Sequence, residues 1–369
     1  MKKVLFVATI TKHIVGFHLP YLKWFKEQGF EVHVASNGKE HIEYCDYHYN
    51  LPFERFPFKF NNFQAYRMLK EIIENNNYDI IHCHTPVGGV LTRIATRKER
   101  KKGTKIIYTA HGFHFYKGAP LLNWLIYYPI EKICSKWTDC LITINEEDYN
   151  ISQKKFNINK IELVNGVGVD EKKFVKKINK IEKEKLKKDI GLKDNDFVII
   201  QIGELNANKN QIMTIEVMKD IVEENKNIKL LLVGKGTLEK FYKQKIKEYN
   251  LQENIKLLGY RNDIVELLNI SDCLVSASKR EGLPVNVIEA MIAGKYIIGT
   301  NCRGNVDLLP KSQLVDIDNI ETLKNKILEL AKNGHAETEV NYDTKKYTKT
   351  EILKQMERIY NFYIKESQI

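Results

Sequence analysis

The chain has 369 residues and a formal net charge of +11, with 43% hydrophobic and 28% charged residues. This length is too great for one ordinary core, so we expect two domains, and the composition excludes a disordered chain. No apolar run approaches the ~20 residues of a membrane-spanning helix. The start, MKKVLFVATI, predicts a buried strand, because no cleavage site of a signal peptide follows it.

The positive charge favours some partners over others. Much of it lies in KKFVKKINKIEKEKLKK (172–188), where interleaved glutamates are typical of a solvated face or a linker. We therefore expect a phosphate-bearing substrate or an anionic membrane surface, and no nucleic acid, because no recognised binding motif accompanies the charge. Six cysteines without a CxxC motif, most of them in apolar runs, are typical of a reduced cytoplasmic protein.

Short β-branched runs alternate with helix-patterned stretches along the first half of the chain. The stretches 63–75 and 86–100 have helical spacing. The runs that we expect to form strands are 4–10, 31–36, 78–85, 105–111, 139–145 and 160–166. Near-continuous apolar strands between helices predict a parallel sheet that is covered on both faces.

The same pattern restarts in the second half. The expected strands are 196–204, 228–236, 254–260, 272–278 and 295–301, and the expected helices are 209–224, 237–249 and 285–293. The Lys-rich segment 171–195 lies between the two sets and is interpreted as the linker.

The sequence thus predicts an α/β fold with two doubly wound, Rossmann-like domains. We expect the first domain at 1–170 and the second at 171–343. A helical stretch at 344–369 follows, which packs on either domain, with a crossing back to the first domain as one arrangement. Ligands of open α/β sheets bind outside the carboxyl ends of the strands, so residues that follow strands and face the cleft between the domains are the candidates for a site.

Two strand ends in the first half carry candidate residues. Gly16 precedes a helical pattern, where a glycine lets the backbone approach a phosphate or a sugar, although a plain turn is the simpler interpretation. His111, in HGFHF, either donates a hydrogen bond to a substrate hydroxyl or merely closes its strand. His82 and His84 share one strand face, but no third ligand is identifiable, so no metal site is predicted.

Strand ends in the second half suit a diphosphate. Gly203 and Glu204 begin GELNANKN, in which Lys209 opens the next helix, where a cation and free amides favour phosphate. An exposed helix lysine is the commoner alternative. The turn GYRND, which contains Arg261, either contacts a nucleotide or only turns the chain.

The stretch KREGLPVNVIEA (279–290) contains two carboxylates around a turn. Pro284 is expected at the first helical position, which would point the amides of Gly282 and Leu283 toward the cleft at the positive end of the helix. Glu281 then lies before the helix and Glu289 about one and a half turns inside it. We interpret the two carboxylates as contacts to different parts of one extended ligand.

Together these features resemble the family-four retaining glycosyltransferases, which have the GT-B architecture. The residues that carry the likeness are Glu281 and Glu289 around GLP, Lys209 in NKN, His111 in TAHGFHF, Gly16 and Asn165-Gly166. The segments YDIIHCHTPVGG, YTAHGFHFYKGAPLLNW and LITINEEDY are typical of the bacterial capsule and exopolysaccharide branch. The likeness extends over nearly the whole chain.

The resemblance implies a role for each candidate. Lys209 would stabilise the diphosphate leaving group in place of a metal ion, and Glu281 and His111 would contact the transferred sugar. Glu289 would bind the ribose, the amides near Gly16 and at 282–283 the phosphates, and the 260–261 turn the base. The implied catalytic residues are Glu281, His111 and Lys209, and the implied donor-binding residues are Gly16, Gly203, Glu204, Arg261, Gly282, Leu283 and Glu289.

The implied activity is retaining transfer of a hexose or N-acetylhexosamine without a metal or other cofactor. The donor would be a UDP-sugar and the acceptor a lipid-diphosphate-linked glycan or a growing polysaccharide. One position departs from the family pattern, because Glu204 stands where many relatives have arginine; Arg280 and Arg303 are candidates for the second cation. The alternatives are a UDP-sugar epimerase of the same architecture and a non-catalytic sugar-nucleotide-binding assembly protein.

Two aromatic and basic stretches suggest how an acceptor in a membrane is reached. These are FERFPFKFNNF (53–63) and GAPLLNWLIYYPIEKICSKW (118–137). They suit a segment that lies on anionic lipid, although core packing is the commoner fate of such aromatic residues. The hypothesis is a cytoplasmic protein, peripheral on the inner face of the cell membrane.

Overall fold

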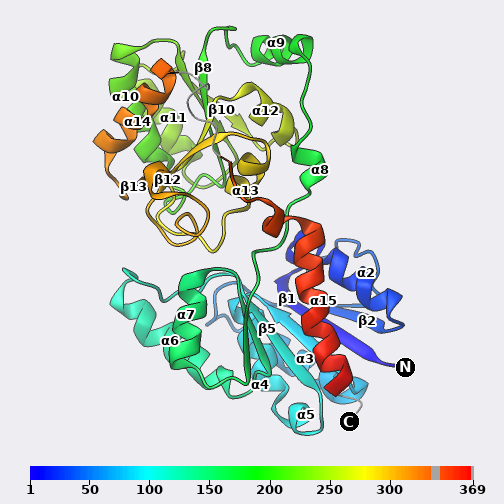
Figure 1. Ribbon diagram of the computed structural model, residues 1–369. Coiled ribbons are helices and arrows are strands. Elements are labelled where there is room, and N and C mark those ends of the chain that lie inside the picture. The colour runs from blue at the N-terminus through cyan, green and yellow to red at the C-terminus, as the bar shows by residue number, and fades with distance from the viewer. Residues whose placement is uncertain (334–340, 367–369) are drawn as a thin grey trace. The chain divides into compact units, whose positions relative to one another are not determined.

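The computed structural model describes residues 1–333 and 341–366 and divides the chain into two compact units. Unit 1 is Met1–Gly168 together with the segment from Lys349 onward, and unit 2 is Val169–Thr348 (Figure 1). Each unit contains one parallel sheet with helices around it. The predicted α/β class, with two Rossmann-like domains, is confirmed.

Unit 1 contains a seven-stranded sheet with the order β3-β2-β1-β4-β5-β6-β7. Its strands are β1 (Lys3–Ile10), β2 (Glu31–Asn37), β3 (Tyr47–Asn50), β4 (Ile80–His84), β5 (Lys105–Ala110), β6 (Cys140–Thr143) and β7 (Lys160–Leu163). Its helices are α1 (Thr11–Phe17), α2 (Leu19–Glu27), α3 (Asn61–Asn76), α4 (Pro86–Ala95), α5 (Arg97–Lys101), α6 (Leu121–Ser135), α7 (Glu146–Lys155) and α15 (Lys349–Glu366). The strand β4 is buried at every position, its two histidines included, as expected of a central strand of a parallel sheet.

The last helix packs on unit 1. Figure 1 shows α15 beside α2, and its side chains join the core formed by β1, β2 and α2. The Tyr360 hydroxyl lies 2.8 Å from His82 Nδ1, and the Tyr363 hydroxyl donates to the Asp139 carbonyl at 3.1 Å. The predicted helix at 344–369 begins at Lys349, and its positions 367–369 lie outside the described residues.

Unit 2 contains a six-stranded sheet with the order β10-β9-β8-β11-β12-β13. Its strands are β8 (Phe197–Ile202), β9 (Ile228–Val233), β10 (Ile255–Gly259), β11 (Cys273–Ser276), β12 (Tyr296–Thr300) and β13 (Leu314–Val315). Its helices are α8 (Glu171–Phe174), α9 (Lys180–Asp189), α10 (Gln211–Glu224), α11 (Glu239–Glu248), α12 (Ile264–Ile270), α13 (Val285–Ile292) and α14 (Ile320–Asn333). Short 3-10 turns lie at Lys311–Gln313 and Lys345–Tyr347.

The Lys-rich segment interpreted as a linker is helical instead. It contains α8 and α9, and α9 packs beside α12 within unit 2. A capping box starts α9, because the Asn179 side chain accepts from the Glu182 amide while the Glu182 carboxylate accepts from the Asn179 amide. This reciprocal cap gives a solvated, charged segment a definite helix start, which its composition alone did not indicate.

Each sheet has one point at which the strand order reverses. In unit 1 this point lies between β1 and β4, and in unit 2 between β8 and β11. The connections on its two sides lead away in opposite directions, which leaves a crevice at the carboxyl ends of these strands. The loops that follow these strands are therefore the expected location of a site. Among the described residues, no helix combines the length and apolar composition needed to cross a bilayer.

Candidate functional site

In unit 2, Lys209 and Glu281 meet at the reversal point of the sheet. Lys209 follows β8 and Glu281 follows β11, and these strands are neighbours. The Lys209 Nζ lies 2.6 Å from Glu281 Oε1, and the two side chains are 22% and 12% exposed. The structure thus brings a predicted cation and a predicted carboxylate into direct contact.

The loop after β8 holds Lys209 in place through its backbone. The Lys209 amide donates to Asn206 Oδ1 at 2.9 Å, and its carbonyl accepts from Gln201 Nε2 at 2.9 Å. Gly203 lies against the Lys209 chain, since a Cβ there would be 3.2 Å from Lys209 Cε. Glu204 is exposed, and its carbonyl accepts from the Gln211 side chain.

Arg303 supports the loop that carries Glu281. Its Nε donates to the Glu281 carbonyl at 2.9 Å, and the Glu281 amide donates to the Arg303 carbonyl at 3.2 Å. Arg303 is 7% exposed, so its charge lies in a largely desolvated position beside Glu281. Both arginines considered as a second cation lie near this loop. The Arg303 side chain contacts Glu281, and the Arg280 carbonyl accepts from Asn208 Nδ2 at 3.0 Å.

The helix α13 begins beside the same carboxylate. Pro284 is its N-cap, with an extended backbone at φ −74° and ψ 112°, and not its first helical residue as predicted. The helix therefore begins one residue later than predicted, at Val285. The fixed φ of proline is compatible with the extended N-cap as well as with the first helical position. Among the described residues, the amides of Gly282 and Leu283 donate to no protein acceptor.

Glu289 lies further along α13 in a desolvated position. Burial raises its pKa to about 7, and Lys173 opposes the rise only in part. Near neutral pH this carboxyl group therefore exists in both protonation states. Such a group is well suited to exchange a proton or a hydrogen bond with a polar ligand.

Arg261 lies in a different local network. It pairs with Asp263, with Nε donating to Oδ1 at 2.8 Å, while Tyr260 beside it is 71% exposed. No contact links Arg261 to the Lys209–Glu281 pair among the described residues. The turn itself nevertheless lies beside the loop after β8, because the Gly259 carbonyl accepts from the amide of Gly234, which packs against Gly203.

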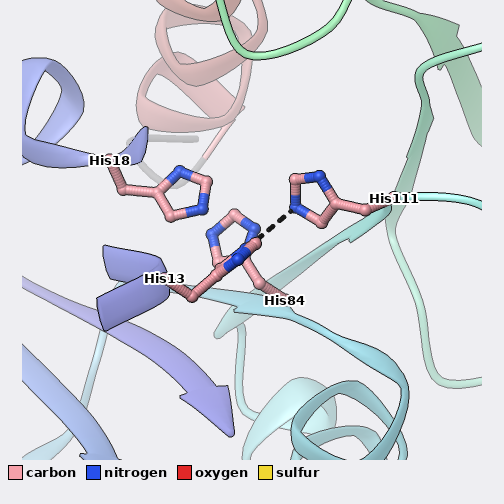
Figure 2. A group of neighbouring side chains, drawn as sticks. All are labelled: His13, His18, His84 and His111. Atoms are coloured by element: carbon pink, nitrogen blue, oxygen red, sulfur yellow. Dashed lines mark hydrogen bonds between the residues drawn. The ribbon is translucent and has the colours of Figure 1, made fainter. Parts of the chain in front are cut away.

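In unit 1, four histidines gather at the reversal point, and we call them the histidine cluster. His13 lies in α1, His18 between α1 and α2, His84 at the end of β4 and His111 directly after β5 (Figure 2). One ring nitrogen of each lies within 4.8 Å of those of the others. His13 and His18 were not predicted from the sequence, in which the one available signal was that both follow the first strand.

The histidine cluster is neutral at physiological pH. Burial lowers the pKa of His13 to about 4 and holds the pKa values of His18, His84 and His111 well below 6.5. The His13 and His111 Nε2 atoms lie 3.2 Å apart, so one ring donates to the other (Figure 2). His82, the other histidine of β4, is fully paired with Tyr360 and Thr109.

Gly16 differs from its expected setting. It lies inside α1, one residue before the end of this helix, and a Cβ there would meet nothing within 4 Å. Gly16 does precede a helix, α2, but it is itself helical and not part of a turn, because α1 begins directly after β1. Its contact to phosphate stays a prediction.

Comparison with known proteins identifies the family. Residues 182–349 match the family described as "Glycosyl transferases group 1", and residues 3–145 match "Glycosyl transferase 4-like". The chain is 44% identical over 310 residues to the putative glycosyltransferase EpsD of Bacillus subtilis, which covers 84% of this chain and 81% of that protein. It is 33% identical over 269 residues, or 70% of this chain and 68% of the relative, to the Escherichia coli UDP-Gal:alpha-D-GlcNAc-diphosphoundecaprenol alpha-1,3-galactosyltransferase.

A solved structure supports the same fold. Anabaena HepE in complex with UDP and glucose superposes with a TM-score of 0.79 at 16% identity, over 98% of this chain and 100% of that one. At this identity the likeness concerns the architecture only.

Proposed function

Because the chain belongs to the group 1 glycosyl transferases and is thus a glycosyltransferase, we propose that it transfers a sugar from a UDP-sugar to a lipid-diphosphate-linked or growing polysaccharide acceptor. The sugar is a hexose or an N-acetylhexosamine, and the pathway is capsule or exopolysaccharide synthesis. The name of the E. coli relative, which specifies a UDP-Gal donor and a diphosphoundecaprenol acceptor, supports both substrate classes.

The observation that carries the proposal is the contact between Lys209 and Glu281 with Arg303 beside it. When the sugar–phosphate bond breaks, negative charge develops on the diphosphate, and fixed cations in a desolvated site stabilise it. Lys209 leaves Glu281 for the phosphate when the donor binds, and Glu281 is then available to the sugar hydroxyls. Arg303 supplies the second cation that Glu204 does not, so the transfer needs no metal ion on the diphosphate.

The remaining residues complete the donor site. The amides of Gly282 and Leu283, at the start of α13, bind the phosphates. In unit 1, the backbone near Gly16 is proposed as a phosphate contact. Glu289 accepts hydrogen bonds from the ribose hydroxyls, and the turn at Arg261 contacts the base. In unit 1, His111 contacts the transferred sugar.

The proposed stereochemical course is retention, with attack on the face from which the diphosphate departs. The leaving diphosphate then serves as the base for the acceptor hydroxyl. In this course Glu281 binds the sugar hydroxyls, and no side chain of the protein forms a covalent bond to the transferred sugar.

The acceptor side of the proposal is supported by an exposed apolar surface on unit 1. The side chains of Phe56, Phe58, Phe60 and Phe63 are 60%, 73%, 82% and 58% exposed, and Leu121, Leu122 and Leu125 of α6 are 73%, 63% and 65% exposed. The alternative that these aromatic residues are core is wrong for them. A cavity of about 180 Å³ is lined by residues of both segments, among them Arg55, Phe58, Tyr127 and Ile130. Such a surface suits a membrane interface and a lipid-linked acceptor.

One assay tests the transfer. The protein is incubated with radiolabelled UDP-sugars and a diphosphoundecaprenol-linked acceptor, and label in the lipid fraction is measured. We expect Lys209→Ala and Glu281→Ala to abolish transfer, while Lys279→Ala, whose ammonium pairs with Asp318 on the exposed surface, keeps it. Isomerised donor would favour the epimerase alternative, and binding without turnover the assembly protein.

Membrane association has its own test. The protein should co-sediment with anionic liposomes at low salt and be released by high salt. Phe58→Ser and Phe60→Ser should weaken this binding, whereas Phe241→Ser, on the 42% exposed side chain of α11 in unit 2, should not. Equal binding of all three variants would refute the docking surface.

A further inference from the structure

The histidine cluster contains buried nitrogen atoms that no protein group satisfies. Both ring nitrogens of His18 and both of His84 are buried without a hydrogen-bond partner, and these residues are 2% and 0% exposed. A neutral imidazole has one donor and one acceptor, and an unpaired buried polar atom costs about 1–3 kcal/mol. Four such nitrogen atoms in one place indicate that the histidine cluster binds a ligand.

The other buried histidines of unit 1 do not have this deficit. His82 contacts the Tyr360 and Thr109 hydroxyls, each at 2.8 Å. His33 contacts the Tyr78 hydroxyl at 2.6 Å and Glu31 at 2.7 Å. Burial of histidine in this fold is therefore ordinarily accompanied by pairing, and the cluster is the exception.

The spacing within the cluster suits a metal ion. Two nitrogens that bind one tetrahedral ion at about 2.0–2.1 Å lie ~3.3 Å apart. His13 Nε2 and His111 Nε2 are already 3.2 Å apart, and the shared hydrogen between them is what a metal ion would replace. Figure 2 shows the four rings converging from different segments, and all candidate ligand atoms lie within 4.8 Å of one another.

One of the four rings must turn before all four can bind the same ion. The rings of His18 and His84 are stacked, with centroids 3.8 Å apart and an angle of 25° between planes. Two stacked rings cannot both aim an in-plane lone pair at one ion. His18 lies in the short junction between α1 and α2, whereas His84 is fixed on β4, so His18 is the ring that turns.

We propose that the histidine cluster binds one divalent transition-metal ion of the zinc class, through His13, His84 and His111, with His18 as the fourth ligand after its ring turns. The cluster, as the described residues define it, contains imidazoles and no carboxylate. Imidazole ligands favour zinc, cobalt, nickel and copper, whereas magnesium and calcium require oxygen ligands. This proposal is opposite to the expectation from sequence, which considered only His82 and His84 and found no third ligand.

The site has a consequence that rests on the proposed function. His111 is assigned there to the transferred sugar, so a bound metal ion would withdraw it from the donor. Zinc would then inhibit transfer by occupying unit 1, and not by binding the diphosphate. If zinc binds but leaves transfer unchanged, the assignment of His111 to the sugar fails while the metal site stands.

The test measures binding without reference to activity. Full-length protein is freed of metal with a chelator and titrated with Zn²⁺ by calorimetry and with Co²⁺ by visible absorption, which reports tetrahedral nitrogen ligation. We expect one ion per chain, no competition from Mg²⁺, and at least a tenfold loss of affinity in His13→Gln and His84→Gln.

Controls separate ligation from folding. His48→Gln removes a histidine of β3 outside the cluster, which contacts Ser36 at 3.0 Å, and should leave zinc affinity unchanged. Because His84 is buried and its variant can fail to fold, the partly exposed His13 provides the second variant. Absence of binding tighter than about 100 μM, or equal affinity in His13→Gln and the parent protein, would overturn the proposal.

Discussion

Replacement of Glu289 by glutamine should stabilise unit 2 while weakening donor binding. Burial raises the pKa of Glu289 from 4.5 to about 7, a difference of about 2.5 pH units. Each unit corresponds to ~1.36 kcal/mol, so the charged carboxylate costs the folded unit about 3 kcal/mol relative to the unfolded chain. Glutamine keeps the shape of the side chain and removes the charge.

The sign of this effect sets its pH dependence. A carboxyl group whose folded pKa is raised carries no penalty below the unfolded value of 4.5, and the full penalty once pH exceeds the folded value of about 7. The stability gain of Glu289→Gln should therefore be small at pH 4.5 and should reach about 3 kcal/mol by pH 8. For a unit of this size, that gain corresponds to an increase in Tm of roughly 6–12 °C.

The assay is urea denaturation at pH 4.5, 6 and 8, with UDP binding by calorimetry at pH 8. Glu223→Gln, an exposed glutamate of α10, is the matched control and should change stability by less than about 0.5 kcal/mol. UDP should bind Glu289→Gln more weakly, because the ribose loses a charged acceptor. A gain that is equal at all three pH values, or a loss of stability at pH 8, would refute the reasoning.

Two further predictions concern a tight backbone contact in unit 2 and a buried ion pair in unit 1. Gly304 has φ +84°, and a Cβ there would lie 2.9 Å from the Gly282 carbonyl, so Gly304→Ala should lower transfer at least tenfold in the radiolabel assay. Gly191→Ala, at φ +75° with Lys256 Cε 3.9 Å from the added Cβ, should affect stability alone, and equal transfer rates in the two variants would contradict the prediction. Glu131→Ala should destabilise unit 1 by about 3–5 kcal/mol in urea, because Arg93, 1% exposed, loses its 2.8 Å partner; a loss below 1 kcal/mol would contradict this.

Much of the fold could be predicted because buried parallel strands have an unmistakable composition. Each strand expected from sequence is present, within a few residues at its ends. The two that escaped prediction are β3, whose four residues are all at least partly exposed, and β13, which has two residues. Neither is long or apolar enough to stand out from a loop, since its place in the sheet depends on the neighbouring strand.

The site was only partly predictable, for a physical reason. Lys209 and Glu281 could be placed at strand ends, and the order of strands in the sheet then makes those ends neighbours. The histidine cluster could not be found in the same way, because its members are scattered from 13 to 111 and their meeting depends on β1 lying beside β4. Likewise, the desolvation of Glu289 arises from packing and has no signature in a linear motif.

Because α15 packs on unit 1, the core of unit 1 cannot be completed until the residues of unit 2 have been synthesised. Unit 1 begins the chain, yet the helix that covers its β1–β2 face is translated after all of unit 2. At about 5–20 residues per second, the ribosome takes roughly 10–40 s to go from residue 168 to residue 366. During that interval Trp24, Phe25 and His82 lack the Tyr360 side chain that covers them in the finished protein. Until α15 is made, the nascent first unit keeps this apolar face exposed, and exposed apolar surface favours aggregation.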